Sequence, residues 1–174
     1  MKKIISILVL SLLIGTVHSQ KMNNKFEIKG ITTAYTTNSS TKKIDKVAIK
    51  VYNQNTLIKT FYSNPKGKFE FNIPKNAYIT LVFEKNNFVT KRVLFDTRSR
   101  NKEINKNVRP FDLEIVLLEH MDGIDYSELD FPITKIQYVK KMKDYYYATK
   151  YTSQMLKTQE TILLKMEELV LSQK

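Results

Sequence analysis

The sequence predicts a mainly β protein, with a seven-stranded antiparallel β-sandwich followed by a long C-terminal α-helix. Between residues 26 and 119 apolar side chains recur at every second position, as in half-buried strands. Gly, Pro, Asn and Ser interrupt this pattern at short intervals, which is typical of strands joined by turns. After residue 138 the chain has no Gly or Pro, and apolar residues return at spacings of three and four, as in an amphipathic helix.

Seven segments carry the strand pattern. In the clearest of them, 68–73, three apolar residues alternate with three polar ones, which specifies the register of the strand well. The last segment is apolar on both faces, so we expect both faces to be covered. The predicted strands are 26–30, 47–52, 57–62, 68–73, 79–83, 89–95 and 113–117.

Two turns are recognisable between these strands. Asn64-Pro65-Lys66-Gly67 has the chemistry of a type I turn, and we expect it to join the third and fourth predicted strands as a hairpin. Asn86-Asn87 is expected to turn the fifth strand into the sixth.

The C-terminal part has a different character. Residues 120–137 are rich in Asp and Glu and are predicted to be a linker or a cap on the sandwich, and 138–174 to be the amphipathic helix. That helix either docks on the sandwich, for instance against the last strand, or waits for a partner. The candidate partner-binding residues are Tyr145, Tyr146, Leu156, Leu163, Met166 and Val170.

The first 19 residues have the order of a secretory signal peptide. Lys2 and Lys3 precede an apolar run over 4–14, which is too short for the ~20 residues that span a bilayer. Small residues occupy the two positions that a signal peptidase inspects, and Ser19 is the last before the cut. We therefore expect an exported chain over 20–174, periplasmic or secreted and soluble, that is not itself membrane-spanning.

Composition narrows the chemistry of this chain. It has no cysteine, which excludes disulfides, thiol nucleophiles and thiolate metal sites. Removing two lysines with the signal peptide lowers the formal net charge from +12 to +10. Such an excess favours anionic partners such as glycans or lipid surfaces, although a Lys- and Asn-rich composition alone would produce it too.

Three segments together resemble a known family. Gly30-Ile31, the stretch 43–51 (KIDKVAIKV) and the stretch 63–74 (SNPKGKFEFNIP) resemble the carboxypeptidase regulatory-like domain, a small transthyretin-like, Ig-like β-sandwich of Gram-negative envelope proteins. Asn64 stands where that family usually has Asp, and Asn87 where Gly is common. The resemblance covers residues 26–118 and implies a non-catalytic module over 20–119.

Few residues could support catalysis or bind a metal. His120 is the only histidine after cleavage, so a zinc site of several imidazoles is excluded, and a Ser–His nucleophile would need this residue. An acidic cluster could bind calcium, but its spacing is not that of an EF-hand, and a solvated linker is the simpler interpretation. That cluster comprises Asp122, Asp125, Glu128 and Asp130. We expect no enzyme activity, no cofactor and no metal site.

The polar stretch 97–109 carries five cations that could hold phosphate or an anionic sugar, because arginine offers a planar fork of donors. They are Arg98, Arg100, Lys102, Lys106 and Arg109. A plain solvated connection would look the same. Aromatic residues do not alternate with these charges, so we expect no nucleic-acid partner.

Together these patterns predict a non-catalytic exported binding or scaffold component of the bacterial cell envelope. The β-sandwich and the terminal helix would contact an envelope or outer-membrane protein. The alternative is a carbohydrate or anionic glycolipid binding module that uses the loop 97–109.

Overall fold

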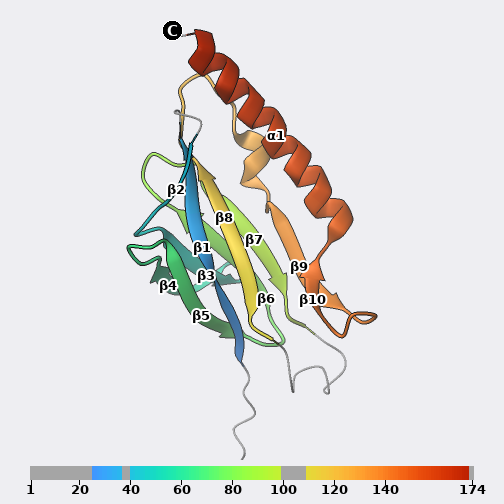
Figure 1. Ribbon diagram of the computed structural model, residues 1–174. Helices are drawn as coiled ribbons and strands as arrows, with labels where there is room; N and C mark the ends of the chain where they lie inside the picture. Colours follow the sequence, from blue (N-terminus) through green and yellow to red (C-terminus); the bar gives the residue numbers. More distant parts are fainter. Residues whose placement is uncertain (1–24, 37–39, 99–108, 173–174) are drawn as a thin grey trace, which may run out of the picture.

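The computed structural model describes residues 25–36, 40–98 and 109–172, so the predicted signal peptide lies outside the described residues. Within them ten strands form two sheets, and the long helix α1 (Thr149–Ser172) follows (Figure 1). The protein is mainly β with a C-terminal helix, as predicted. The expected number of seven strands is wrong, because three more strands lie in segments predicted as loop, linker and helix.

The first sheet is organised around β1 (Lys25–Thr36). On one side β1 pairs antiparallel with two strands: its first part, from Lys25 to Ile31, pairs with β5 (Lys68–Pro74), and its last part, from Thr33 to Thr36, pairs with β2 (Ser40–Lys43). On the other side it pairs in parallel with β8 (Phe111–Leu118). The expectation of a purely antiparallel structure is therefore wrong, since a parallel pair between distant segments leaves no local signal in the sequence.

The second sheet has six strands in the order β10-β9-β7-β6-β3-β4. Its neighbours pair antiparallel except for β7 and β9, which are parallel. The strands are β3 (Ala48–Asn53), β4 (Thr56–Tyr62), β6 (Tyr78–Glu84), β7 (Lys91–Asp96), β9 (Thr134–Val139) and β10 (Asp144–Tyr147). Asn87 turns β6 into β7 with a φ of 66°, which confirms that predicted turn.

The two sheets pack face to face around one hydrophobic core. The Phe69 ring of the first sheet lies 5.7 Å from the Phe83 ring of the second, centroid to centroid. Gly30 on β1 allows close packing within the first sheet, because a Cβ there would lie 1.8 Å from the Leu113 carbonyl oxygen of β8 and 2.8 Å from the Phe69 ring of β5. The missing side chain lets β1 approach β8 closely and leaves its space to Phe69.

The turn at 64–67 has the predicted chemistry but joins different partners. The Asn64 side chain accepts hydrogen bonds from the backbone N–H groups of Lys66 and Lys68, at 2.9 and 3.0 Å. The Gly67 carbonyl accepts one from Thr32 of β1 at 2.8 Å. Since β4 pairs with β3 and β5 with β1, the turn crosses between the sheets, and the expected hairpin is wrong.

The predicted helix over 138–174 begins only at Thr149, because β9 and β10 form a hairpin immediately before it. The helix docks on the two-sheet body through a second apolar cluster, in which Met155, Ile162 and Met166 pack with Leu118 of β8. Tyr151 also donates a hydrogen bond to the Pro132 carbonyl at 2.6 Å. Leu118, on the outer face of β8, is thus covered, as the sequence predicted, while Val116 on the same face stays half-buried.

Residues 120–137 are not a solvated linker. They contain the short helix η2 (Ser127–Asp130) and most of β9, and they contribute Met121 and Leu129 to the second apolar cluster. Acidic side chains remain exposed on the outer surface of this segment. The segment therefore connects the sheets to the helix as a packed layer.

Candidate functional site

The outward face of the first sheet carries charged side chains in rows across its strands. Strand register forms the rows Glu70–Lys29–Asp112 and Lys68–Ile31–Glu114. Lys29 Nζ lies 3.7 Å from Asp112 Oδ1, and both side chains are well exposed. Such a pair contributes little to stability, so these charges remain available to a partner at small cost.

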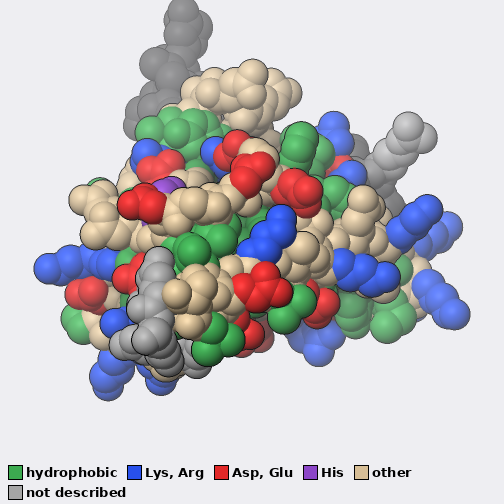
Figure 2. Space-filling model, turned by 90° about the horizontal axis from the view of Figure 1, so that it is seen from above, with side chains coloured by type: hydrophobic (Ala, Val, Ile, Leu, Met, Phe, Trp, Pro, Cys, Tyr) green, Lys and Arg blue, Asp and Glu red, His purple; other side chains and the backbone are tan. Residues whose placement is uncertain are grey.

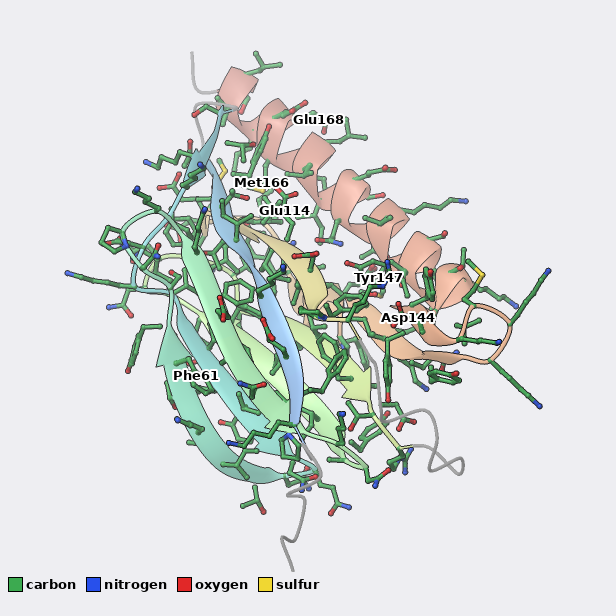
Figure 3. The ribbon with its side chains drawn as sticks, turned by 60° about the horizontal axis from the view of Figure 1, so that its bottom comes forward. Phe61, Glu114, Asp144, Tyr147, Met166 and Glu168 are labelled. Atoms are coloured by element: carbon green, nitrogen blue, oxygen red, sulfur yellow. The ribbon has the colours of Figure 1, made fainter. Side chains whose placement is uncertain are left out.

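This face is hollowed where it meets β10. One depression of about 820 Å³ runs from the charged rows to Tyr147, and a second of about 390 Å³ continues along β10 past Asp144. Lys29 and Asp112 line both, so the two form one open feature, which we call the β8–β10 groove. In Figure 3, Glu114 marks the β8 side of the groove, and Tyr147 and Asp144 mark the β10 side.

Tyr147 forms a fixed wall of the groove. Its ring packs edge-on against Phe111 at 5.3 Å between centroids, while 40% of the residue remains exposed. Partial burial raises the pKa of Tyr147, and the nearby carboxylates Asp112 and Glu114 raise it further. The hydroxyl therefore stays protonated near neutral pH and can both donate and accept a hydrogen bond.

Two predicted residues from different motifs meet in the groove. Arg109, from the basic loop, and Tyr146, from the tyrosine cluster, line the same depression. Arg109 donates two hydrogen bonds to Asp144 Oδ2, from Nε at 3.1 Å and from Nη2 at 2.8 Å, and this contact raises the pKa of Arg109.

The rest of the predicted anion site is divided. Arg98 donates two hydrogen bonds of 2.8 Å to the Asp96 carboxylate, and its guanidinium carbon lies 4.8 Å from the centre of the Tyr78 ring. The same contact lowers the pKa of Asp96. Arg100, Lys102 and Lys106 lie outside the described residues. Both described arginines are thus already bound to carboxylates.

Of the six residues predicted to bind a partner, two are core residues. Tyr145, on β10 instead of the helix, is only 4% exposed and packs on Phe26, and Met166 is buried in the second apolar cluster. Leu163 and Val170 are partly buried against the same cluster. Leu156, by contrast, is 52% exposed. A partner could therefore reach Leu156 without displacing the helix.

The sequence did not indicate Lys29, Asp112 or Glu114 as site residues. Asp112 and Glu114 alternate with apolar residues in β8, and this pattern shows only that one face is solvated. Their convergence with Lys29 depends on the parallel pairing of β8 with β1.

The acidic cluster has structural contacts. The Asp125 side chain accepts a hydrogen bond from the Ser127 N–H at 2.9 Å, which lowers the pKa of Asp125, and Asp130 lies 3.4 Å from Arg92. The described part of the chain contains no group of three His, Cys, Asp or Glu residues placed to hold a metal ion. Nor does any helix in it combine the length and the apolar character needed to cross a bilayer.

Comparison with known proteins gives no assignment. No family model and no curated protein match the chain. Among solved structures, the Bacillus anthracis TIE protein is 14% identical over 54% of this chain and 18% of its own, with a TM-score of 0.39. The 3-chlorocatechol 1,2-dioxygenase of Rhodococcus opacus 1CP is 10% identical over 55% of this chain and 60% of its own, with a TM-score of 0.35. The matched part spans less than two thirds of either chain, and at these TM-scores neither likeness bears on fold family or activity.

Proposed function

We propose that this chain is a non-catalytic exported binding or scaffold component of the bacterial cell envelope, with a transthyretin-like β-sandwich as its body. We further propose that it contacts a protein partner through the β8–β10 groove. The observation that supports this is the convergence of exposed charges of both signs and a fixed tyrosine in one open groove. Export itself rests on the pattern of residues 1–19.

The groove suits an extended polypeptide segment. Its rows present Lys29 and Lys68 beside Glu70, Asp112 and Glu114, so a segment with charges of both signs finds complementary groups along its length. Charge complementarity of this kind sets the register and specificity of a contact more than its affinity.

Apolar contacts complete the proposed surface. Ile31 lies between charged neighbours at the centre of the rows, and Tyr147 offers a large side chain with little conformational entropy to lose. These two side chains would supply most of the affinity, because aromatic and aliphatic anchors dominate interface energies.

The proposal can be tested by crosslinking in cells. A photoreactive residue placed at Ile31 or Tyr147 should capture the same partner band, whereas one at the exposed Thr161 of α1 should not. Glu114→Lys should weaken capture from Ile31, and Glu128→Lys, on exposed η2, should leave it unchanged. Equal capture from all three positions, or none from the groove, would contradict the proposal.

The alternative is the anionic glycan or glycolipid site on the loop 97–109. The convergence of Arg109 with Tyr146 favours it, since the arginine fork matches a carboxylate or phosphate and the tyrosine hydroxyl can add a hydrogen bond. Against it, Arg98 and Arg109 would first have to leave Asp96 and Asp144. Salt-dependent glycan binding that disappears in Arg98→Ala/Arg109→Ala, with groove crosslinks unaffected, would favour this alternative.

A further inference from the structure

The β9–β10 hairpin ends in a tip of four exposed residues, 140–143. Three are lysines, Lys140, Lys141 and Lys143, and the fourth is Met142, which is 54% exposed. The tip is ordered by its own backbone, because Met142 N–H bonds the Val139 carbonyl at 3.0 Å and Lys143 N–H bonds that of Lys140 at 3.3 Å. Figure 1 shows the hairpin projecting from the two-sheet body.

Charge is segregated along the chain on both sides of this tip. From residue 131 to residue 159 the chain has six lysines and one acid, Asp144, which Arg109 already engages. The neighbouring acids lie in 119–130 and 160–168 instead. Figure 2 shows Lys and Arg side chains projecting at both ends of the molecule, including the right-hand end, the side on which Figure 1 places the hairpin.

The backbone of the tip is strained at a charged residue. Lys143 has a φ of 53°, in the left-handed region that Gly or Asn adopts at lower cost. Gly or Asn there would relieve the strain and remove one of the three positive charges. The lysine is therefore not explained by the needs of the turn. Lys46, far from the tip in the sequence, has a similar φ of 51°, so this backbone conformation supports a functional role only together with the charge and exposure of the tip.

We propose that the hairpin tip binds the anionic surface of a phospholipid bilayer, with Met142 entering the headgroup boundary and the three lysines contacting lipid phosphates. Lysine stems are long and flexible enough to lie along a membrane surface while their ammonium groups remain solvated. An apolar side chain at the apex adds a contact that a bilayer stabilises and a soluble polyanion does not. A soluble polyanion would need the lysines but not Met142.

This contact goes beyond the proposed partner groove, and it is peripheral and reversible. Near an anionic membrane each lysine strengthens binding by roughly fivefold, so neutralising all three should weaken it by about a hundredfold. Loss of the Met142 side chain should lower the affinity for the membrane about fivefold, because one apolar side chain is partly buried there. Binding should also fall steeply as salt rises.

The test is co-sedimentation of the protein, expressed from residue 20, with unilamellar vesicles of phosphatidylcholine containing phosphatidylglycerol, at 50 and 300 mM salt. We expect binding at low salt, none to pure phosphatidylcholine, and about a hundredfold loss in Lys140→Gln/Lys141→Gln/Lys143→Gln. The matched control neutralises the exposed lysines Lys42, Lys43 and Lys66 and should change binding only slightly.

Two single variants separate a lipid site from a polyanion site. Met142→Ser should weaken vesicle binding about fivefold and leave binding to heparin unchanged. Lys143→Asn should weaken vesicle binding while keeping or raising stability, because it relieves the left-handed strain. Equal losses in the two triple variants, no vesicle binding, binding to heparin alone, or an unaffected Met142→Ser would each overturn the proposal. The groove crosslinks are independent of these outcomes.

Discussion

A buried lysine at the helix interface should make the stability of the protein depend on pH. Lys91 is 1% exposed, and its Nζ bonds the side-chain oxygen of Gln159 on α1. Among the described residues no carboxylate forms an ion pair with it. Burial lowers the pKa of Lys91 from 10.5 to about 7, because the charged form loses its hydration without gaining a counter-ion.

The sign of the effect follows from proton binding in the two states. Between pH 7 and 9 the unfolded chain keeps the Lys91 proton, whereas the folded chain progressively loses it. Stability therefore rises with pH in this window, and the free energy of unfolding should increase by about 2 kcal/mol. Below pH 7 both states hold the proton, so the contribution of Lys91 becomes flat.

Urea unfolding followed by circular dichroism at pH 6, 7, 8 and 9 measures this dependence. Lys91→Met keeps the apolar stem and removes the ionisable amine, so its free energy of unfolding should no longer rise between pH 7 and 9. Lys66→Met, at an exposed position, should show the same rise as wild type. The free energy of unfolding of Lys91→Met minus that of wild type should be about 2 kcal/mol larger at pH 7 than at pH 9. Parallel pH profiles for wild type and Lys91→Met would show that Lys91 does not titrate near neutrality.

Three further changes and one control test the packing and a buried hydrogen bond, each by urea unfolding at pH 8. Gly30→Ala should cost about 3 kcal/mol or prevent folding, since the added Cβ would force β1 away from the Leu113 carbonyl. Thr97→Val should cost about 1–3 kcal/mol, because the Thr97 hydroxyl accepts the buried Ala77 N–H at 3.0 Å. Met166→Ala should cost about 2–4 kcal/mol and expose α1 to limited proteolysis, while Leu156→Ala should cost less than about 0.5 kcal/mol.

Strands with strong alternation were predictable, and strands without it were not. All seven predicted segments correspond to strands, including 68–73, which is β5. β2 was missed because its four residues, Ser40–Lys43, are polar and all exposed, so it has no buried face to mark it. Its pairing comes from the exceptional length of β1.

The β9–β10 hairpin was missed for a different reason. Its turn, 140–143, contains no Gly, Pro, Asn or Asp, so nothing in the sequence marks a break between the hairpin and the helix, and the helical spacing continues back to Tyr145. The alternation of Ile136 and Tyr138 in β9 was the signal that favoured a strand. For this reason the predicted helix wrongly includes Tyr145, and the sequence does not indicate Tyr147 as a wall of the β8–β10 groove.

Parts of the candidate site could not be predicted from local pattern at all. Asn64 and Gly67 specify a tight turn, but which strands it joins depends on the hydrogen bond between Gly67 and Thr32 of β1. The groove likewise depends on pairing between segments that are about eighty residues apart in the chain, at Lys29 and Asp112. Such contacts are decided by how the whole core closes.

The central position of β1 has a consequence for the order in which the molecule can fold. β1 is the first described strand of the chain, yet its partners β5 and β8 follow only from Lys68 and Phe111 onward. A chain that emerges N-terminus first can pair β1 with β2 and then with β5, but the edge of β1 that receives β8 must stay unpaired until Phe111–Leu118 is available. Long-range pairing of this kind slows folding, so we expect refolding to be limited by the docking of β8 on β1. Until β8 docks, the unpaired edge of β1 is exposed to aggregation and needs protection.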